Sequence, residues 1–301
     1  MNKTFFLTGS ARGLGRSIAL EILNSGHQLV ATARKPDQLG DLVERYGSQI
    51  LPVALDVTDF EAAKAAVNLG LDRFGRLDVV INNAGFADVG SVEDMPMQSI
   101  ASQFNTNFLG SVHVIKAVLP VLRQQGQGRI IQISSIGARI ATAGAAGYYA
   151  TKWALSGFIE SLAIEVAPLG IKVTALEPGG MKTDFAEEAS MIILPTSPAY
   201  ETTVGETVRL MKSPQYLENY ADPADVAAVV TRLADLADPP VRLLVGGANY
   251  EYVRSVEQAR VQADEQWKWL TVVNDVAVGP SDASSHGLDQ NQRDPSPSAL
   301  T

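Results

Sequence analysis

Short apolar segments that alternate with helix-like segments constrain the fold of this chain most strongly. Several of the apolar segments are continuous, as in Val79–Ile81, Ile130–Ile131 and Leu243–Val245. Continuous apolar runs are typical of strands that are buried on both faces of a parallel sheet. Because such strands alternate here with helical segments, we expect an α/β fold with one doubly wound, seven-stranded parallel sheet and helices on both of its faces.

The pattern also predicts where the chain departs from this regular alternation. The predicted strands cover residues 3–8, 28–33, 50–55, 77–81, 129–134, 171–176 and 241–245. Residues 1–250 form the predicted domain, and residues 180–221 are long enough, for a connection, to act as a lid over a site. A C-terminal helical extension is expected at residues 251–278. Residues 279–301 are rich in Ser, Asp, Gln, Asn and Pro, and we expect a disordered tail there.

Composition and charge exclude several classes of function. The net charge of −9 argues against a nucleic-acid partner, which would require a basic surface. The sequence has no cysteine, and its three histidines are far apart, so we expect neither thiol chemistry nor a metal site. No apolar run reaches the roughly 18 residues of a membrane span. No secretion signal is recognised at the N-terminus, and we expect a cytoplasmic protein without membrane contact.

A glycine-rich turn separates the first predicted strand from the first predicted helix. Its sequence from Thr8 to Gly15 has the spacing G-x-x-x-G-x-G. Glycines allow a backbone to approach a pyrophosphate closely, and a helix N-terminus offers free N–H groups to it. An ordinary glycine-rich turn is the alternative, but the position between strand and helix favours nucleotide binding. The predicted cofactor contacts of this turn are Gly9, Ser10, Arg12, Gly13, Leu14 and Gly15.

The end of the second predicted strand indicates which dinucleotide is preferred. A site for NAD needs an acidic side chain there to bind the ribose 2′-hydroxyl. This chain instead has Arg34 and Lys35 at that position, and Arg12 could reach the same region. Guanidinium groups pair well with a 2′-phosphate, so NADP(H) is the expected cofactor. The alternative is that Arg34 and Lys35 are simply a solvated pair of surface charges.

A candidate catalytic pair lies on the helix after the fifth predicted strand. Tyr148 and Lys152 are four residues apart, which places both side chains on one helical face. A nearby ammonium lowers the pKa of a tyrosine from about 10 and makes it a usable acid/base. Ser135 follows the fifth strand, and Asn107 lies within a long helical segment where asparagine is unfavourable. Each residue alone could equally be structural.

The ordered set of motifs resembles the short-chain dehydrogenase/reductase family over about residues 3–250. The resemblance is nearest to the branch with hydroxysteroid and retinol dehydrogenases, and it implies a single Rossmann domain. It rests on the turn at Thr8–Gly15, Asp56, Asn82–Gly85, Asn107, Ser135, Tyr148 with Lys152, and Pro178-Gly179-x-x-x-Thr183.

The family resemblance implies a role for each matching residue. Tyr148 is the implied acid/base, Ser135 orients the carbonyl, and Lys152 lowers the tyrosine pKa and holds the nicotinamide ribose. Asn107 is expected to hold a water that relays protons from Lys152, and Asp56 to bind the adenine amine. The remaining implied cofactor contacts are Val57, Asn83, Ala84, Gly85, Pro178, Gly179, Met181 and Thr183. A homodimer or other homo-oligomer is implied as well, although the extension beyond Val245 puts the common tetramer of the family in doubt.

The sequence therefore predicts an oxidoreductase that moves a hydride between NADP(H) and an alcohol or carbonyl carbon, in the direction of ketone or aldehyde reduction. A non-catalytic NADP(H) sensor or scaffold is the main alternative, because a fold does not fix a function. An epimerase or dehydratase is a further one. We expect an apolar substrate, because the residues predicted to line the pocket are Phe86, Val89, Ile140, Met181, Phe185, Met191, Ile192 and Ile193.

Overall fold

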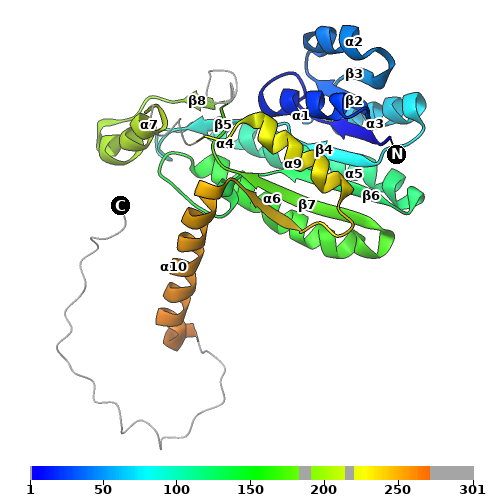
Figure 1. Ribbon diagram of the computed structural model, residues 1–301. Coiled ribbons are helices and arrows are strands. Elements are labelled where there is room, and N and C mark those ends of the chain that lie inside the picture. Colours follow the sequence, from blue (N-terminus) through cyan, green and yellow to red (C-terminus); the bar gives the residue numbers. More distant parts are fainter. Residues whose placement is uncertain (1, 183–190, 214–219, 272–301) are drawn as a thin grey trace, which may run out of the picture. The chain divides into compact units, whose positions relative to one another are not determined.

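Seven parallel strands form one sheet in the computed structural model, which describes residues 2–182, 191–213 and 220–271 (Figure 1). All neighbouring strands pair in parallel. In spatial order the strands are β3 (Ile50–Ala54), β2 (Gln28–Ala33), β1 (Thr4–Leu7), β4 (Val79–Asn82), β6 (Gly128–Ile133), β7 (Ile171–Pro178) and β9 (Arg242–Val245).

The strand order reverses between β1 and β4, which makes the sheet doubly wound. From β1 the chain proceeds outward to β3, then crosses back to β4 and proceeds outward to β9. In sheets of this kind, ligands bind at the carboxyl ends of the strands where the order reverses. The predicted fold class is confirmed. A ligand site is expected at the carboxyl ends of β1 and β4, where the order reverses.

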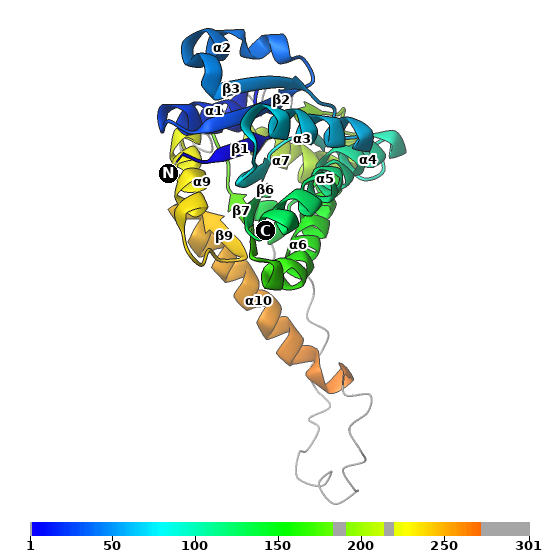
Figure 2. The same ribbon diagram turned by 90° about the vertical axis from the view of Figure 1, so that its right-hand side faces the viewer.

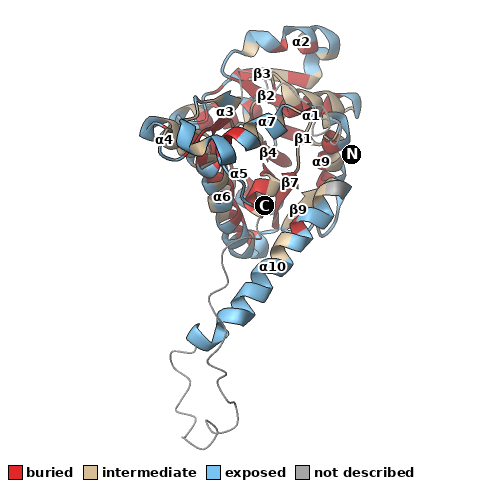
Figure 3. Cartoon of the chain, turned by 90° about the vertical axis from the view of Figure 1, so that its left-hand side faces the viewer, coloured by how far each residue is buried: buried red, intermediate tan, exposed pale blue. Residues whose placement is uncertain are grey.

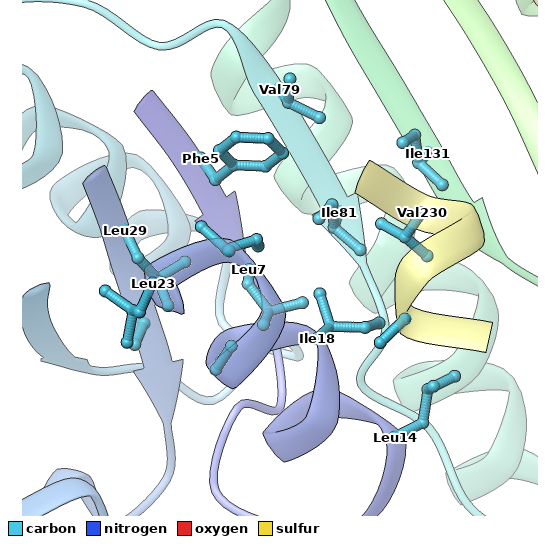
Figure 4. Close-up of a cluster of buried hydrophobic side chains, with 14 of the residues drawn as sticks. Phe5, Leu7, Leu14, Ile18, Leu23, Leu29, Val79, Ile81, Ile131 and Val230 are labelled. Atoms are coloured by element: carbon cyan, nitrogen blue, oxygen red, sulfur yellow. The ribbon is translucent and has the colours of Figure 1, made fainter. Parts of the chain in front are cut away.

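Helices cover both faces of the sheet because successive side chains of each strand point to opposite sides. On one face, Phe5 and Leu7 belong to a buried cluster with side chains of α1 (Gly13–Asn24), α2 (Gly40–Tyr46) and α9 (Pro223–Asp235), part of which is shown in Figure 4. On the other face, Phe6 lies in the cluster formed with α3 (Phe60–Phe74), α5 (Gly110–Gln125) and α6 (Ala146–Val166), helices visible in Figure 2. Burial colouring shows most of the central strands between these layers in red, whereas β9 at the edge of the sheet is only partly buried (Figure 3). Each buried Phe or Leu contributes roughly 1.5–3 kcal/mol.

Capping residues account for where two of these helices start and stop. The Asp59 carboxylate accepts a hydrogen bond from the Ala62 N–H at 3.0 Å, and Gly75 ends α3 with a φ of 78°. The Asp222 carboxylate caps α9 by accepting from the Ala224 N–H at 2.8 Å, with Pro223 in the first turn. Both arrangements satisfy backbone groups that a helix end leaves unpaired.

A two-stranded sheet that the sequence did not predict joins a segment after β4 to the predicted lid. Strand β5 (Ala87–Val89) pairs in parallel with β8 (Met191–Ile193). Both strands have three residues, which is too short to give a recognisable alternation of apolar and polar side chains. The lid continues through a short helix, α7 (Glu206–Met211). The described part of the predicted lid is thus attached to the domain by backbone hydrogen bonds.

The long helical segment expected at Met97–Arg123 contains a change of helix type. It consists of α4 (Met97–Gln103), a π-helical segment at Phe104–Leu109, and α5. Asn107 lies inside the π-helical segment, where the regular α-helical hydrogen-bonding pattern is interrupted. Such segments are frequent at functional sites.

The contacts of the chain divide it into two units, Met1–Val256 and Glu257–Thr301. The boundary falls within α10 (Gly247–Thr271). The expected tail at residues 279–301 lies outside the described residues. Among the helices that are described, none is both long and apolar enough to span a membrane.

Candidate active site

Four segments that carry predicted site residues follow the carboxyl ends of four neighbouring strands. The glycine-rich turn follows β1, and Asn83–Gly85 follow β4. Ser135 follows β6, and Gly179 follows β7. The fold therefore collects these segments on one edge of the sheet, on both sides of the strand-order reversal.

The turn after β1 can be built only with glycine at its key positions. Gly9 has a φ of 68° and Gly13 a φ of 50°, both in the left-handed region. A Cβ on Gly15 would lie 2.0 Å from the Gly9 carbonyl oxygen. The residue that precedes α1, Arg12, makes no side-chain capping hydrogen bond to the helix. The first amides of α1 are thus left uncapped by that side chain, which suits an anion.

Thr8 and Asn83 fasten this turn to the end of β4. The Thr8 Oγ1 accepts hydrogen bonds from the amides of Asn83 and Ala84 at 2.9 and 3.0 Å. The Asn83 Nδ2 donates to the carbonyl oxygens of Thr8 and Gly9 at 3.0 and 3.2 Å. The Asn83 side chain therefore holds the turn in place, a contact that its sequence motif alone did not specify.

Asp56, Val57 and Arg34 lie at the adjoining strand ends. The Asp56 carboxylate accepts from the backbone N–H and the hydroxyl of Thr58, at 2.9 and 2.8 Å. The pKa of Asp56 lies below its usual range, mainly because of the Thr58 N–H bond, with a smaller contribution from the positive charge of Arg34. Arg34 itself is exposed and makes no hydrogen bond within the described part of the chain. Val57 is buried.

Tyr148, Ser135 and Lys152 are brought together by α6 and the end of β6. The Ser135 hydroxyl forms a side-chain hydrogen bond with Tyr148 and accepts another from the Gly137 N–H at 3.0 Å. The Lys152 ammonium lies 5.5 Å from the centroid of the Tyr148 ring and donates to the Ile133 carbonyl oxygen at 3.1 Å. Lys152 is only 6% exposed. The group has the composition of an acid/base centre.

The pKa values of this group differ from the sequence prediction. Burial raises the pKa of Tyr148 to about 12, although the hydrogen bond with Ser135 acts in the opposite direction. Burial also lowers the pKa of Lys152 to about 8. The predicted lowering of the tyrosine pKa is not found, because burial, the largest effect, outweighs the hydrogen bond with Ser135. Tyr148 is consequently protonated at neutral pH, as a proton donor must be.

Asn107 uses its whole side chain to hold neighbouring backbone and Thr151. Its Oδ1 accepts from the Phe86 N–H at 2.9 Å, and its Nδ2 donates to the Phe86 carbonyl at 2.8 Å. Nδ2 also donates to the Thr151 Oγ1 at 3.2 Å. Gly85 beside it has no room for a Cβ, which would lie 3.1 Å from the Asn107 Oδ1. The structure thus shows Asn107 joining the loop after β4 to α6.

The segment after β7 is also tightly packed. A Cβ on Gly179 would lie 1.9 Å from the Asn249 Nδ2. Met181 and Ala221 form an isolated parallel β-bridge, and the Lys182 N–H donates to the Ala221 carbonyl at 2.9 Å. Pro178 is the last residue of β7. Thr183 and Phe185 lie outside the described residues.

An apolar side chain of the predicted lid, Val204, lies close to Val89 and to Gly144. Val89 and Ile140, both predicted to line the pocket, are buried, whereas Ile192 is half exposed. A Cβ on Gly144 would lie 3.2 Å from Val204 and 3.4 Å from Val89. Val204 was not predicted, because nothing in the sequence indicated which residues of the lid face inward.

The sequence also did not predict a buried ion cluster that contacts the segment after Ser135. The Glu177 carboxylate is fully buried and pairs with the Arg139 Nε at 2.5 Å and with the Arg242 Nε at 2.7 Å. Arg242 also donates to the Ala138 carbonyl at 3.3 Å. The cluster therefore fixes the segment that follows Ser135. A glutamate within the otherwise apolar β7 was the available signal.

Two relatives match this chain over most of its length. An oxidoreductase of Botryotinia fuckeliana (strain B05.10) is 44% identical over 275 residues, which cover 91% of this chain and 100% of that protein. Retinol dehydrogenase 8 of Bos taurus is 31% identical over 252 residues, or 80% of each protein. The second match agrees with the branch that the sequence motifs resemble.

Solved structures and a family profile point to the same family. A short-chain dehydrogenase from Streptomyces avermitilis has a TM-score of 0.84 at 33% identity, and the match covers 92% of this chain and 100% of that one. ElxO with NADP bound has a TM-score of 0.70 at 27% identity, with coverage of 83% and 100%. The profile of the family described as short chain dehydrogenase matches residues 3–191. This chain is therefore an oxidoreductase of the short-chain dehydrogenase/reductase family.

Proposed function

We propose that this protein is an NADP(H)-dependent reductase of ketones or aldehydes, in which Tyr148 is the general acid. The observation that carries the proposal is the contact of Tyr148 with both Ser135 and Lys152 at the edge of the sheet that also bears the glycine-rich turn. A buried, protonated phenol beside a serine hydroxyl suits proton transfer to a carbonyl oxygen.

The residues present fit a dinucleotide phosphate. A Cβ at Gly15 would clash with the Gly9 carbonyl oxygen, so α1 packs closely against the turn, as in a dinucleotide-binding site. Arg34, together with Arg12 of the turn, would take the 2′-phosphate, and Asp56 would bind the adenine amine. The other residues that would hold the cofactor are Ser10, Gly13, Leu14, Val57, Asn83, Ala84, Gly85, Lys152, Pro178, Gly179, Met181 and Thr183. The bound cofactor supplies or accepts the hydride.

The side chains of the site do the remaining chemistry. The hydroxyls of Ser135 and Tyr148 both hydrogen-bond to the substrate oxygen and orient it. Tyr148, whose phenol is protonated at neutral pH, gives its proton to that oxygen. Lys152, with its ammonium beside the ring, holds positive charge where the phenolate forms.

An apolar substrate fits the lining of the lid and loops. Val89, Ile140 and Val204 are buried apolar side chains close to the Ser135 loop. The similarity to a retinol dehydrogenase supports the same class of substrate. In this proposal residues 180–221 form the lid that excludes water during the reaction.

The alternative is a protein that binds NADP(H) on this fold without catalysis. A sensor of that kind would need the glycine-rich turn and Arg34 but not the contact between Ser135 and Tyr148. The presence of both features favours the enzyme, because the second has a use only when a substrate oxygen is bound.

Arg34 is expected to make NADPH the preferred cofactor. We predict at least about tenfold tighter binding of NADPH than NADH, equivalent to about 1.4 kcal/mol, which one bidentate guanidinium–phosphate contact can supply. The variant Arg34→Asp should erase or invert this preference because it repels the 2′-phosphate. Titration of cofactor fluorescence measures both affinities, and oxidation of either cofactor with a panel of small and bulky carbonyls tests turnover.

Arg45→Asp is the matched control for this prediction. Arg45 is also exposed, lies on the neighbouring helix α2, and stacks on Tyr46 at 5.0 Å from the ring centroid. The control makes the same change in net charge and should keep the NADPH preference. Equal affinity of the parent protein for NADPH and NADH would show that Arg34 does not bind the 2′-phosphate.

A further inference from the structure

A buried glutamine lies beside the candidate catalytic lysine. Gln132 is 1% exposed and occupies the penultimate position of β6, between Ile131 and Ile133. It faces the same side of the sheet as Ile130, toward α5 and α6. Apolar residues usually occupy such positions in a parallel sheet. A buried amide here is therefore expected to make hydrogen bonds that an apolar side chain could not make.

Gln132 and Lys152 donate to the same oxygen atom. The Lys152 Nζ lies 3.1 Å from the Ile133 carbonyl oxygen, and the Gln132 Nε2 lies 3.2 Å from it. A carbonyl oxygen has two lone pairs, and these two donors take both of them. The orientation of the amide is fixed, because Nε2 also donates to the Asn82 carbonyl at 3.3 Å. The reversed amide would place its oxygen against two carbonyl oxygens.

The same amide begins a chain of buried hydrogen bonds that returns to α6. The Asn82 Nδ2 donates to the Ser111 carbonyl at 3.3 Å, and the Ser111 hydroxyl donates to the Asn107 carbonyl at 2.9 Å. Asn107 donates to the Thr151 Oγ1 at 3.2 Å, which donates to the Tyr148 carbonyl at 2.7 Å. Sequential bonds of this kind connect β6, β4, α5 and the helix that carries both catalytic candidates.

The other end of the Gln132 amide is unsatisfied by protein. Its Oε1 is buried and has no hydrogen-bond partner among the described residues. Leaving a buried acceptor unpaired is costly, and an apolar residue of the same shape would avoid the cost. The amide must therefore be retained for what its donors do, and those donors hold the carbonyl that Lys152 uses.

We propose that Gln132 is a positioning residue for Lys152, because it shares the Ile133 carbonyl with the ammonium and so sets where the ammonium lies and how readily it stays charged. By taking one lone pair of that oxygen, Gln132 weakens the hold of the β6 backbone on Lys152. The ammonium can then stay close to the Tyr148 ring and stabilise its phenolate. This role rests on the proposed function, in which Lys152 supports the phenolate of Tyr148.

Lys152 offers a readout that does not require a substrate. Its pKa is lowered to about 8 by burial, and Tyr148 is the ionisable side chain that it faces. A carboxylate at position 132 would neighbour the ammonium, favour its charged form and draw it toward β6. The pKa of Lys152 should then rise by about one unit or more.

The test compares Gln132→Glu with Gln125→Glu. Gln125 also clamps backbone by its amide, donating to the Leu77 carbonyl at 2.7 Å and accepting from the Leu77 N–H at 3.2 Å, but near the opposite end of β4. Lysine labelled with carbon-13 at Cε reports the Lys152 titration by NMR, assigned with Lys152→Met. Gln132→Glu should raise the Lys152 pKa and lower kcat about tenfold or more, the scale of a displaced catalytic group. Any rise in the KM for NADPH should be smaller than the fall in kcat, since Lys152 is one of several proposed cofactor contacts and the phosphate turn is untouched. Gln125→Glu should change none of these values.

A second variant guards against misfolding of the first. Gln132→Met keeps the side-chain volume and removes both donor bonds, and it should also lower kcat by a larger factor than it raises the KM for NADPH. An unchanged Lys152 titration in Gln132→Glu, or an equal shift in Gln125→Glu, would overturn the proposal. If the parent protein reduces no carbonyl and the Lys152 titration still moves, the proposed function fails while the positioning of Lys152 by Gln132 stands.

Discussion

Replacement of Tyr148 by phenylalanine is expected to lower turnover by a factor of about 10² or more, the range for loss of a general acid. The variant removes the hydroxyl that hydrogen-bonds with Ser135 and leaves the ring that lies beside Lys152. NADPH affinity should change little, because the glycine-rich turn and Arg34 are untouched. Steady-state kinetics with a responsive carbonyl and a fluorescence titration of NADPH measure the two effects separately.

The adjacent Tyr149 provides the control for this prediction. Its hydroxyl bonds to Thr142 at 2.8 Å, and its ring packs against Gly137, where a Cβ would lie 2.5 Å from it. These are contacts of a residue that supports the loop, so Tyr149→Phe should keep most of the activity. A dead Tyr149→Phe beside an active Tyr148→Phe would show that the wrong face of α6 has been assigned to catalysis.

Removal of the Glu177 carboxylate should give the largest loss of stability. Glu177→Ala removes the buried carboxylate that the guanidinium groups of Arg139 and Arg242 share. Breaking a buried pair on one side costs about 3–5 kcal/mol. We expect a value near the lower end, about 3 kcal/mol, because both arginines keep partial access to water. Urea unfolding at neutral pH measures the change.

Glu160→Ala tests the same partner without burial. Glu160 pairs with Arg242 at 2.9 Å but is half exposed, so its loss should cost less than about 1 kcal/mol. Similar losses for the two variants would mean that burial of Glu177 does not control the energy of this cluster. A stable Glu177→Ala with reduced kcat would instead indicate that the cluster acts mainly on the Ser135 segment.

The sheet and the placement of the motifs could be predicted because they depend on local patterns. Continuous apolar runs such as Val79–Ile81 identified strands buried on both faces, and a parallel sheet puts all of their carboxyl ends on one edge. The turn at Gly9–Gly15 and the four-residue spacing of Tyr148 and Lys152 are equally local. Their assembly follows from the topology alone.

Features that depend on contacts between distant segments could not be predicted. The pairing of Ala87–Val89 with Met191–Ile193 joins residues about a hundred positions apart through strands too short to show a pattern. Glu177 appears in the sequence as one acidic residue in an apolar strand, and its two arginine partners lie in other segments. Sequence patterns carry no information about which charges meet.

The predicted shift in the pKa of Tyr148 had the wrong direction for a related reason. The sequence gives the spacing to Lys152 but not the burial of either group, and burial raises the tyrosine pKa to about 12 while it lowers that of Lys152 to about 8. Asn107 was identified as a polar residue at an unfavourable helical position, and the structure adds the π-helical segment and the clamp on Phe86. Thr183 lies outside the described residues, and its contact with the cofactor stays a prediction.

Transfer of deuterium from the cofactor to a carbonyl carbon tests the proposed reaction most directly. The protein is incubated with NADPH deuterated at either face of C4 and with ketones or aldehydes of increasing apolar size, and the alcohols are analysed by mass spectrometry. We predict that one of the two labelled cofactors delivers deuterium to the carbinol carbon, and that Tyr148→Phe suppresses this transfer while it still binds NADPH. Tight binding of NADPH by the parent protein without deuterium transfer to any member of the panel would contradict the account and favour the NADP(H) sensor.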